Sequence, residues 1–261
     1  MQRLALGVSY RGTSYLGWQS QAGGRTIQDE LEAALAKFAD QPVRTWCAGR
    51  TDSGVHGLNQ VVHIDTPLDR PVFSWLRGTN RYLPDDIALQ WCQPVPPDFH
   101  ARNSAIGRRY VFLLRESVVR PALETGLCGW VFRPLNQELM QRAAELLIGE
   151  HDFSAFRSAE CQAASPVKVM RRISIERRGA YWRFDFEASA FLHHMVRNIM
   201  GCLVAVGTQT KSVDWLHGVL AAKNRALAAP TFPPDGLYFV GPQYDAAYNI
   251  PATTAAMDWL P

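Results

Sequence analysis

The ten residues AGRTDSGVHG, Ala48 to Gly57, decide how this chain is organised, because the segments on both sides have the pattern of strands. Residues 43–47 (VRTWC) and 59–65 (NQVVHID) are rich in β-branched and aromatic side chains, as strands are. Three glycines within the stretch indicate a backbone that turns sharply or lies against a ligand. The sequence therefore predicts a glycine-rich turn between two strands.

The same turn presents an acid and a base, Asp52 and Arg50. An aspartate with its usual pKa near ~3.9 is ionised at neutral pH, and a carboxylate held ionised in a cleft acts as a nucleophile or an electrostatic stabiliser. The alternative is an aspartate that only hydrogen-bonds its own turn, which is the usual role of this residue in glycine-rich loops. The loop alone favours that alternative.

Outward from the loop, the first half of the chain follows a strand, helix, strand order. Thr26 and Asp29 have the spacing of a helix N-terminus, and apolar residues then recur at helical spacing from Ile27 to Phe38. Three prolines between Pro94 and Pro97 indicate a boundary or crossover. Further elements are predicted as strands at 4–10 and 87–93 and a helix at 71–82 that Gly78 weakens.

The second half repeats this order. A strand is predicted at 109–115, a helix between an Asn136 cap and Gly149, paired strands at 168–178 and 181–188, helices at 192–206 and from Ser212, and a strand at 237–240. The pattern predicts an α+β protein in which two similar α/β lobes, residues 1–104 and 105–261, have a mainly antiparallel sheet flanked by helices.

The amino-acid composition limits the classes of function that this chain can have. The chain has 261 residues, 47% of them hydrophobic, and a net charge of +3. Of its 27 basic residues, 23 are arginines, which favours phosphate or nucleic-acid binding but also fits a genomic bias. The five cysteines are spread without a C-x-x-C pair, so neither a zinc site nor a disulfide framework is expected. The N-terminus lacks the pattern of a secretory signal and no apolar stretch reaches membrane length, so we expect a cytoplasmic protein.

Three further segments contain side chains that could bind a ligand or take part in catalysis. Tyr110 follows two arginines, a pattern that suits base stacking or a sheet face with solvated charges. His193 and His194 on a helix would point ~100° apart, which disfavours a shared metal. Arg197 borders the apolar stripe of that helix and needs a carboxylate partner, for which Asp52 is a candidate. The pairs Arg171-Arg172 and Arg177-Arg178 suit either a solvated face or a phosphate-binding rim.

Several ordered motifs resemble the TruA family of tRNA pseudouridine synthases. They are AGRTDSGVHG at 48–57, GRRYVF at 107–112, HHMVRN at 193–198 and GLY at 236–238, with YLGWQ at 15–19, QVVH at 60–63, DFHAR at 98–102 and HDFSAF at 151–156. The resemblance covers nearly the whole chain, up to about Gly241.

The resemblance implies the pseudouridine synthase fold with a central positively charged cleft, and isomerisation of uridine at nucleotides 38, 39 and 40 of the tRNA anticodon arm by a homodimer without a cofactor or metal. It implies that Asp52 is the nucleophile, that Tyr110 packs against the target uracil and that Arg197 keeps Asp52 ionised. Arg50 would help to displace the base, and Leu237 would supply an apolar wall. Ser53 departs from the alanine that the family often has there.

Two other functions stay open at this point. One is a non-catalytic tRNA-binding protein on the same scaffold. The other is a nucleoside or glycoside hydrolase, although such enzymes use two carboxylates or a metal-bound water, and no second acid of comparable context lies near Asp52 in the sequence. Whether Asp52 attacks C1′ of the ribose or C6 of the base, or promotes elimination, also stays open.

Overall fold

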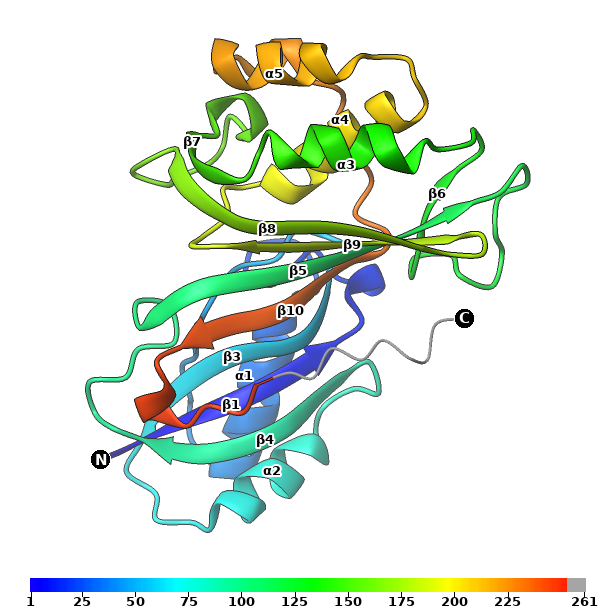
Figure 1. Ribbon diagram of the computed structural model, residues 1–261. Coiled ribbons are helices and arrows are strands. Elements are labelled where there is room, and N and C mark those ends of the chain that lie inside the picture. The colour runs from blue at the N-terminus through cyan, green and yellow to red at the C-terminus, as the bar shows by residue number, and fades with distance from the viewer. Residues whose placement is uncertain (253–261) are drawn as a thin grey trace. The chain divides into compact units, whose positions relative to one another are not determined.

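The computed structural model describes residues 1–252, within which two compact units are distinguished (Figure 1). Among the described residues, unit 1 contains 1–106 and 238–252, whereas unit 2 contains 107–237. Residues 253–261, the end of the predicted second lobe, lie outside the described residues. In the described part of the chain, no helix is both long enough and apolar enough to cross a membrane.

Unit 1 is a twisted sheet with two helices packed on it. Its strands follow the order β4-β1-β3-β10, and the short β2 also pairs with β3. All of these pairings are antiparallel except that of β10 with β3. The elements are β1 (Gln2–Tyr10), α1 (Ile27–Ala39), β2 (Trp46–Cys47), β3 (His56–Thr66), α2 (Val72–Asn80), β4 (Ile87–Val95) and β10 (Leu237–Tyr244).

The core of unit 1 forms between one face of β1 and the apolar stripe of α1. Leu4, Leu6 and Val8 alternate on one face of β1, and Leu31 and Leu35 of α1 belong to the same buried cluster. Each fully buried side chain of this kind stabilises the fold by roughly 1.5–3 kcal/mol. The predicted helix start is confirmed, because the Thr26 side chain accepts a hydrogen bond from the backbone N–H of Asp29.

Unit 2 repeats the combination of sheet and helices. Its strands follow the order β5-β9-β8-β7, and β6 pairs in parallel with β5. Figure 1 shows α3, α4 and α5 stacked on one side of β8 and β9. The elements are β5 (Ala105–Glu116), β6 (Gly129–Val131), α3 (Gln137–Glu145), β7 (Gly149–Asp152), β8 (Val167–Arg178), β9 (Tyr181–Ala188), α4 (Met195–Gly207) and α5 (Val213–Ala222). The predicted α+β class with a mainly antiparallel sheet is confirmed.

Some local predictions for unit 2 were wrong. Gly149 does not close α3, which ends at Glu145; with φ of 107° it begins β7 instead. The helix predicted from residue 192 starts at Met195, because His194 adopts the left-handed conformation, with φ of 63°, at the N-cap. The short strands β6 and β7 were not predicted, since three or four residues give too little periodicity to recognise.

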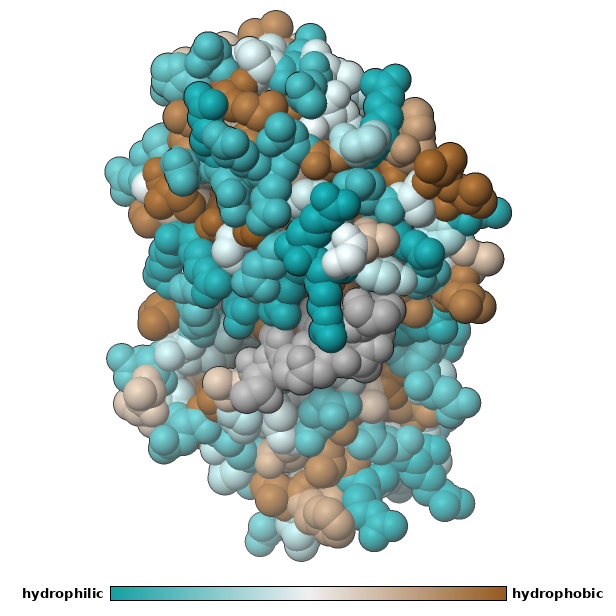
Figure 2. All heavy atoms as spheres, turned by 45° about the vertical axis from the view of Figure 1, so that its right-hand side comes forward, coloured by the Kyte–Doolittle hydropathy of each residue, from teal (hydrophilic) through white to brown (hydrophobic). Residues whose placement is uncertain are grey.

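One strand of unit 1 comes from the C-terminal part of the chain. The C-terminal strand β10 returns to unit 1, where Tyr238 and Phe239 pair with His56 and Gly57 of β3. A strand pairing across more than 180 residues leaves no local signature, so only the folded sheet reveals it. Figure 2 shows a face on which hydrophilic residues dominate and hydrophobic residues form separate patches.

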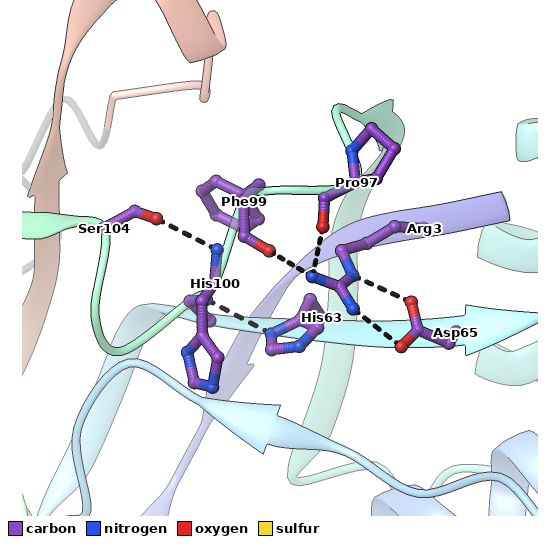
Figure 3. Close-up of polar contacts among 8 residues, drawn as sticks. Arg3, His63, Asp65, Pro97, Phe99, His100 and Ser104 are labelled. Atoms are coloured by element: carbon purple, nitrogen blue, oxygen red, sulfur yellow. Dashed lines mark hydrogen bonds and ion pairs between the residues drawn. The ribbon is translucent and has the colours of Figure 1, made fainter.

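A polar network in unit 1 fixes the segment that leads from β4 into β5 (Figure 3). The Arg3 guanidinium donates to both carboxylate oxygens of Asp65, at 2.8 Å each, and to the carbonyl oxygens of Pro97 and Phe99. The backbone N–H of Ala101 donates to Nδ1 of His63 at 3.2 Å. Side chains of β1 and β3 thereby anchor the segment between β4 and β5.

Candidate active site

The glycine-rich stretch 48–57 is the connection between β2 and β3, as its sequence predicts. Its first residues are fixed by hydrogen bonds to residues of β3. The backbone N–H of Ala48 donates to the carbonyl of Val61 at 2.9 Å. The Gln60 side chain accepts from the N–H of Gly49 at 3.3 Å and donates to the carbonyl of the same residue. The loop therefore leaves the sheet in one defined direction.

Asp52 begins a turn over residues 52–55, and the backbone is held on both sides of its side chain. Trp18 N–H donates to the carbonyl of Thr51 at 3.0 Å, and Val55 N–H donates to the carbonyl of Asp52 at 3.2 Å. Gly54 has φ of 81°, a conformation that glycine adopts without steric cost. The Asp52 side chain is half-buried. A carboxylate on a fixed backbone, still partly open, can meet an incoming substrate with little loss of side-chain freedom.

Glycines in the segment after β1 allow that segment to lie directly against the loop. A Cβ atom on Gly12 would lie 1.9 Å from the carbonyl oxygen of Val55. Gly17 has φ of 90°, and a Cβ atom there would lie 2.5 Å from the carbonyl oxygen of Thr51. Neither contact leaves room for a methyl group, because the opposing atoms belong to the backbone. The loop conformation thus depends on two glycines outside the loop itself.

Arg50, on the same loop, is exposed. It forms no hydrogen bond or salt bridge with any other described residue. An exposed guanidinium with free donors suits a phosphate or a base edge. Unit 1 therefore brings together two of the predicted site residues, Asp52 and Arg50.

Unit 2 carries the other three predicted residues, which are linked through the segment 232–237. Arg197, half-buried on α4, donates from Nε to the carbonyl of Phe232 at 2.9 Å. The Phe232 ring packs against Phe112 of β5, with ring centroids 5.5 Å apart, and Tyr110 lies two residues earlier on the same strand. Leu237 ends the segment and is buried, with 4% exposure.

Tyr110 is half-buried, and its ring meets the edge of Phe191, with centroids 5.1 Å apart and planes at 84°. This contact fixes the orientation of the phenol ring from the side. His193 and His194 precede α4 rather than lying on it, so the ~100° divergence expected for helical neighbours does not apply. Their rings instead lie with centroids 4.0 Å apart.

Sequence reasoning missed the residues that support the loop. Tyr10 donates or accepts a hydrogen bond with the Thr51 hydroxyl at 2.8 Å, and the backbone N–H of Gly12 donates to Nδ1 of His56 at 3.1 Å. Burial raises the pKa of Tyr10, so its phenol stays protonated. The only hint in the sequence was Gly12, which follows the strand predicted at 4–10.

Comparison with known proteins places the chain among RNA-modifying enzymes. The family model described as "tRNA pseudouridine synthase" matches residues 7–103 and 143–245. A protein named tRNA pseudouridine synthase A from Methylibium petroleiphilum is 70% identical to this chain, over 99% of the chain and 100% of the relative. The proteins of that name from Polaromonas naphthalenivorans and Paracidovorax citrulli are each 60% identical, with the same coverage.

Among solved structures, the archaeal box H/ACA sRNP Nop10-Cbf5 complex matches 86% of this chain and 60% of the solved chain. With 13% identity and a TM-score of 0.37, this likeness is too weak to place any residue.

Proposed function

Because this chain belongs to the tRNA pseudouridine synthase family, as the family model and relatives of up to 70% identity show, we propose that it isomerises the uridines at nucleotides 38, 39 and 40 of the tRNA anticodon arm. Family membership gives the reaction class, which is conversion of uridine to pseudouridine in tRNA, so the enzyme is an isomerase. The proposal adds the location in the tRNA. The observation that carries the proposed isomerisation is Asp52, half-buried at the start of a turn whose backbone is fixed on both sides.

The reaction breaks the N1–C1′ bond, turns the base and joins C5 to C1′. The C5 proton is lost and N1 gains one, so no atom or electron is gained overall, and no redox cofactor is needed. A carboxylate can serve as the nucleophile at C1′ or at C6, or promote elimination. Asp52 fills this role in the proposal, and the lobe that carries it, formed mainly by residues 1–104, is the catalytic one.

The remaining residues act on the uridine and on the carboxylate. Arg197 keeps Asp52 ionised, because a cation beside a carboxylate favours its charged form. Tyr110, whose ring is fixed by Phe191, packs against the target uracil, and Leu237 offers it an apolar wall. Arg50 helps to displace the base, and extrusion of a stacked base costs a few kcal/mol that contacts to the RNA backbone offset.

The proposed assembly is a cytoplasmic homodimer. Large apolar side chains are exposed in the segment from β5 to α3: Val118 is 86% exposed, Val119 77%, Leu123 94% and Phe132 59%. Exposed apolar side chains of this kind are typical of a surface that another subunit covers. The proposal therefore includes this segment in the contact between the two subunits.

The decisive experiment is incubation with unmodified tRNA transcripts, followed by chemical mapping of pseudouridine. The wild-type chain is expected to modify nucleotides 38–40. The Asp52→Asn variant is expected to modify none of them. Pseudouridine elsewhere in the tRNA would refute the location. Release of free uracil would indicate a hydrolase, and tight tRNA binding without any modified nucleotide would indicate the non-catalytic binding protein.

A further inference from the structure

The short strand β2 carries an aromatic residue between arginines. Trp46 is half-buried on β2, opposite His63 of β3, while Arg44 and Arg50 on either side of the strand are exposed. Arginines that alternate with an aromatic side chain on a strand edge are a feature of surfaces that bind nucleic acid. A binding site also requires that the surroundings hold these side chains in a fixed position.

A rigid support lies beneath Trp46. Its indole stacks on the His63 imidazole, with ring centroids 5.0 Å apart and planes at 13°. His63 is only 2% exposed and accepts a hydrogen bond from Ala101 N–H, and the His100 ring packs against its edge at 4.7 Å (Figure 3). Burial lowers the pKa of His63 to about 4, with further lowering from His100 and Arg3 and an opposing effect of Asp65, so its ring is neutral near pH 7.

Arg44 lies over this supported indole, with its guanidinium carbon 5.3 Å from the ring centroid. Such contact holds a cation at a fixed place while leaving its N–H groups available. Neither Arg44 nor Arg50 forms a salt bridge with any residue in the described part of the chain, unlike Arg3 and Arg109, which pair with carboxylates.

A third guanidinium adds positive charge to this edge. Burial raises the pKa of the Cys47 thiol to about 11, while the nearby guanidinium groups of Arg50 and Arg102 act in the opposite direction. Arg102 is exposed and directly follows Ala101, whose N–H binds the His63 ring beneath Trp46. We call Trp46 and the exposed arginines Arg44, Arg50 and Arg102 the β2 edge, in which Arg44 is the cation that lies over the aromatic ring.

We propose that the β2 edge binds the sugar-phosphate backbone of the tRNA substrate outside the target uridine, with Arg44, held on Trp46, contacting a phosphate group. This inference rests on the proposed function for its choice of ligand. A phosphate group supplies the acceptor oxygens and the negative charge that Arg44 lacks within the described protein. Because the stack of Arg44, Trp46 and His63 already holds the arginine in place, most of the entropic cost of ordering it on binding is removed.

The test measures the affinity for unmodified tRNA over a range of salt concentrations, separately from isomerisation. Each phosphate contact contributes about 0.7–0.9 to the slope of log K against log salt. Arg44→Ala is expected to lower that slope by this amount and to weaken binding about 5- to 8-fold at 0.1 M salt. Arg44→Lys keeps the charge and should restore the slope. Trp46→Leu should weaken binding with the slope unchanged, since it loosens Arg44 without removing its charge.

Arg77→Ala is the matched control, because Arg77 is also exposed and lies over an aromatic ring, Phe73, at 5.6 Å. Its affinity and slope should equal those of the wild type, and thermal melting checks that every variant is folded. An Arg44→Ala variant with unchanged affinity and slope, or with a loss no larger than that of Arg77→Ala, would overturn the inference. Because binding and modification are read separately, a chain that binds through Arg44 yet modifies no uridine would refute the proposed function alone.

Discussion

The hydroxyl groups of Tyr10 and Thr51 lie 2.8 Å apart in the buried interior of unit 1. This hydrogen bond ties the last residue of β1 to the residue directly before Asp52, so the first strand of the sheet helps to fix the loop that carries Asp52. A side chain that must reach a reacting atom benefits from such support, because small displacements of a catalytic group reduce rates strongly.

Replacement of the carboxylate itself is the most direct prediction. Asp52→Asn preserves the size of the side chain but removes its charge and nucleophilicity, so isomerisation should fall by a factor of about 10⁴ or more. The affinity for tRNA should stay within about threefold of wild type, because the arginines supply most of the binding. Single-turnover assays and filter binding measure the two quantities, and residual turnover near the wild-type rate would remove Asp52 from the mechanism.

The glycines beside the loop give a second prediction. Gly17→Ala should lower kcat/KM more than tenfold, because the new Cβ atom would lie 2.5 Å from the Thr51 carbonyl and displace the loop. Gly23→Ala is the matched control: Gly23 has a similar φ of 87°, but its Cβ atom would have no neighbour within 4 Å. Both variants should lose about 1–2 kcal/mol of stability from backbone strain, and Gly17→Ala should lose more because its Cβ atom also collides with the Thr51 carbonyl. Equal kcat/KM in the two variants would contradict this account of the loop.

Removal of the proposed cation beside Asp52 should change the pH dependence. Arg197→Gln should move the acid limb of the kcat/KM profile to higher pH, because a carboxylate without a cationic neighbour takes up a proton more readily. Arg197→Lys should retain the wild-type limb, although it loses the hydrogen bond from Nε to Phe232. A lowered rate with an unshifted limb in Arg197→Gln would show that Arg197 acts only through packing.

The buried imidazole of His63 predicts how stability depends on pH. Its pKa is lowered to about 4 by burial, whereas the unfolded chain takes up the proton near pH 6.5. The neutral imidazole therefore makes its full contribution to the free energy of unfolding above pH 6.5. This contribution, up to about 3 kcal/mol, is lost as pH falls toward 4. Urea unfolding between pH 4 and 7 measures it. His63→Asn, which keeps an acceptor for Ala101 N–H, should show a flatter curve, and two parallel curves would contradict the assignment.

The proposed subunit contact can be tested at one exposed residue. Leu123→Glu should shift the chain from dimer to monomer in sedimentation experiments at micromolar concentration, because a charge in an apolar contact opposes association. Leu227→Glu is the control, since Leu227 is a 53% exposed leucine outside the segment from β5 to α3. A wild-type chain that sediments as a monomer, or a Leu123→Glu variant that remains dimeric, would exclude this surface.

Much of this protein could be predicted from local sequence. The Thr26 cap, the apolar stripe of α1 and the hairpin of β8 and β9 across Gly179 all follow from interactions between residues a few positions apart. The placement of Asp52 on a glycine-rich turn between two strands was likewise local, and its role came from the resemblance of the surrounding motif rather than from the turn alone.

The tertiary structure decided whatever depends on distant partners. The return of β10 to β3, the left-handed start of α4 at His194 and the neutral, buried state of His63 beneath Trp46 have no signature within a short window. The physical reason is that hydrogen-bond caps and side-chain periodicity act over a few residues, whereas sheet register and burial bring together residues that the chain separates by tens to hundreds of positions.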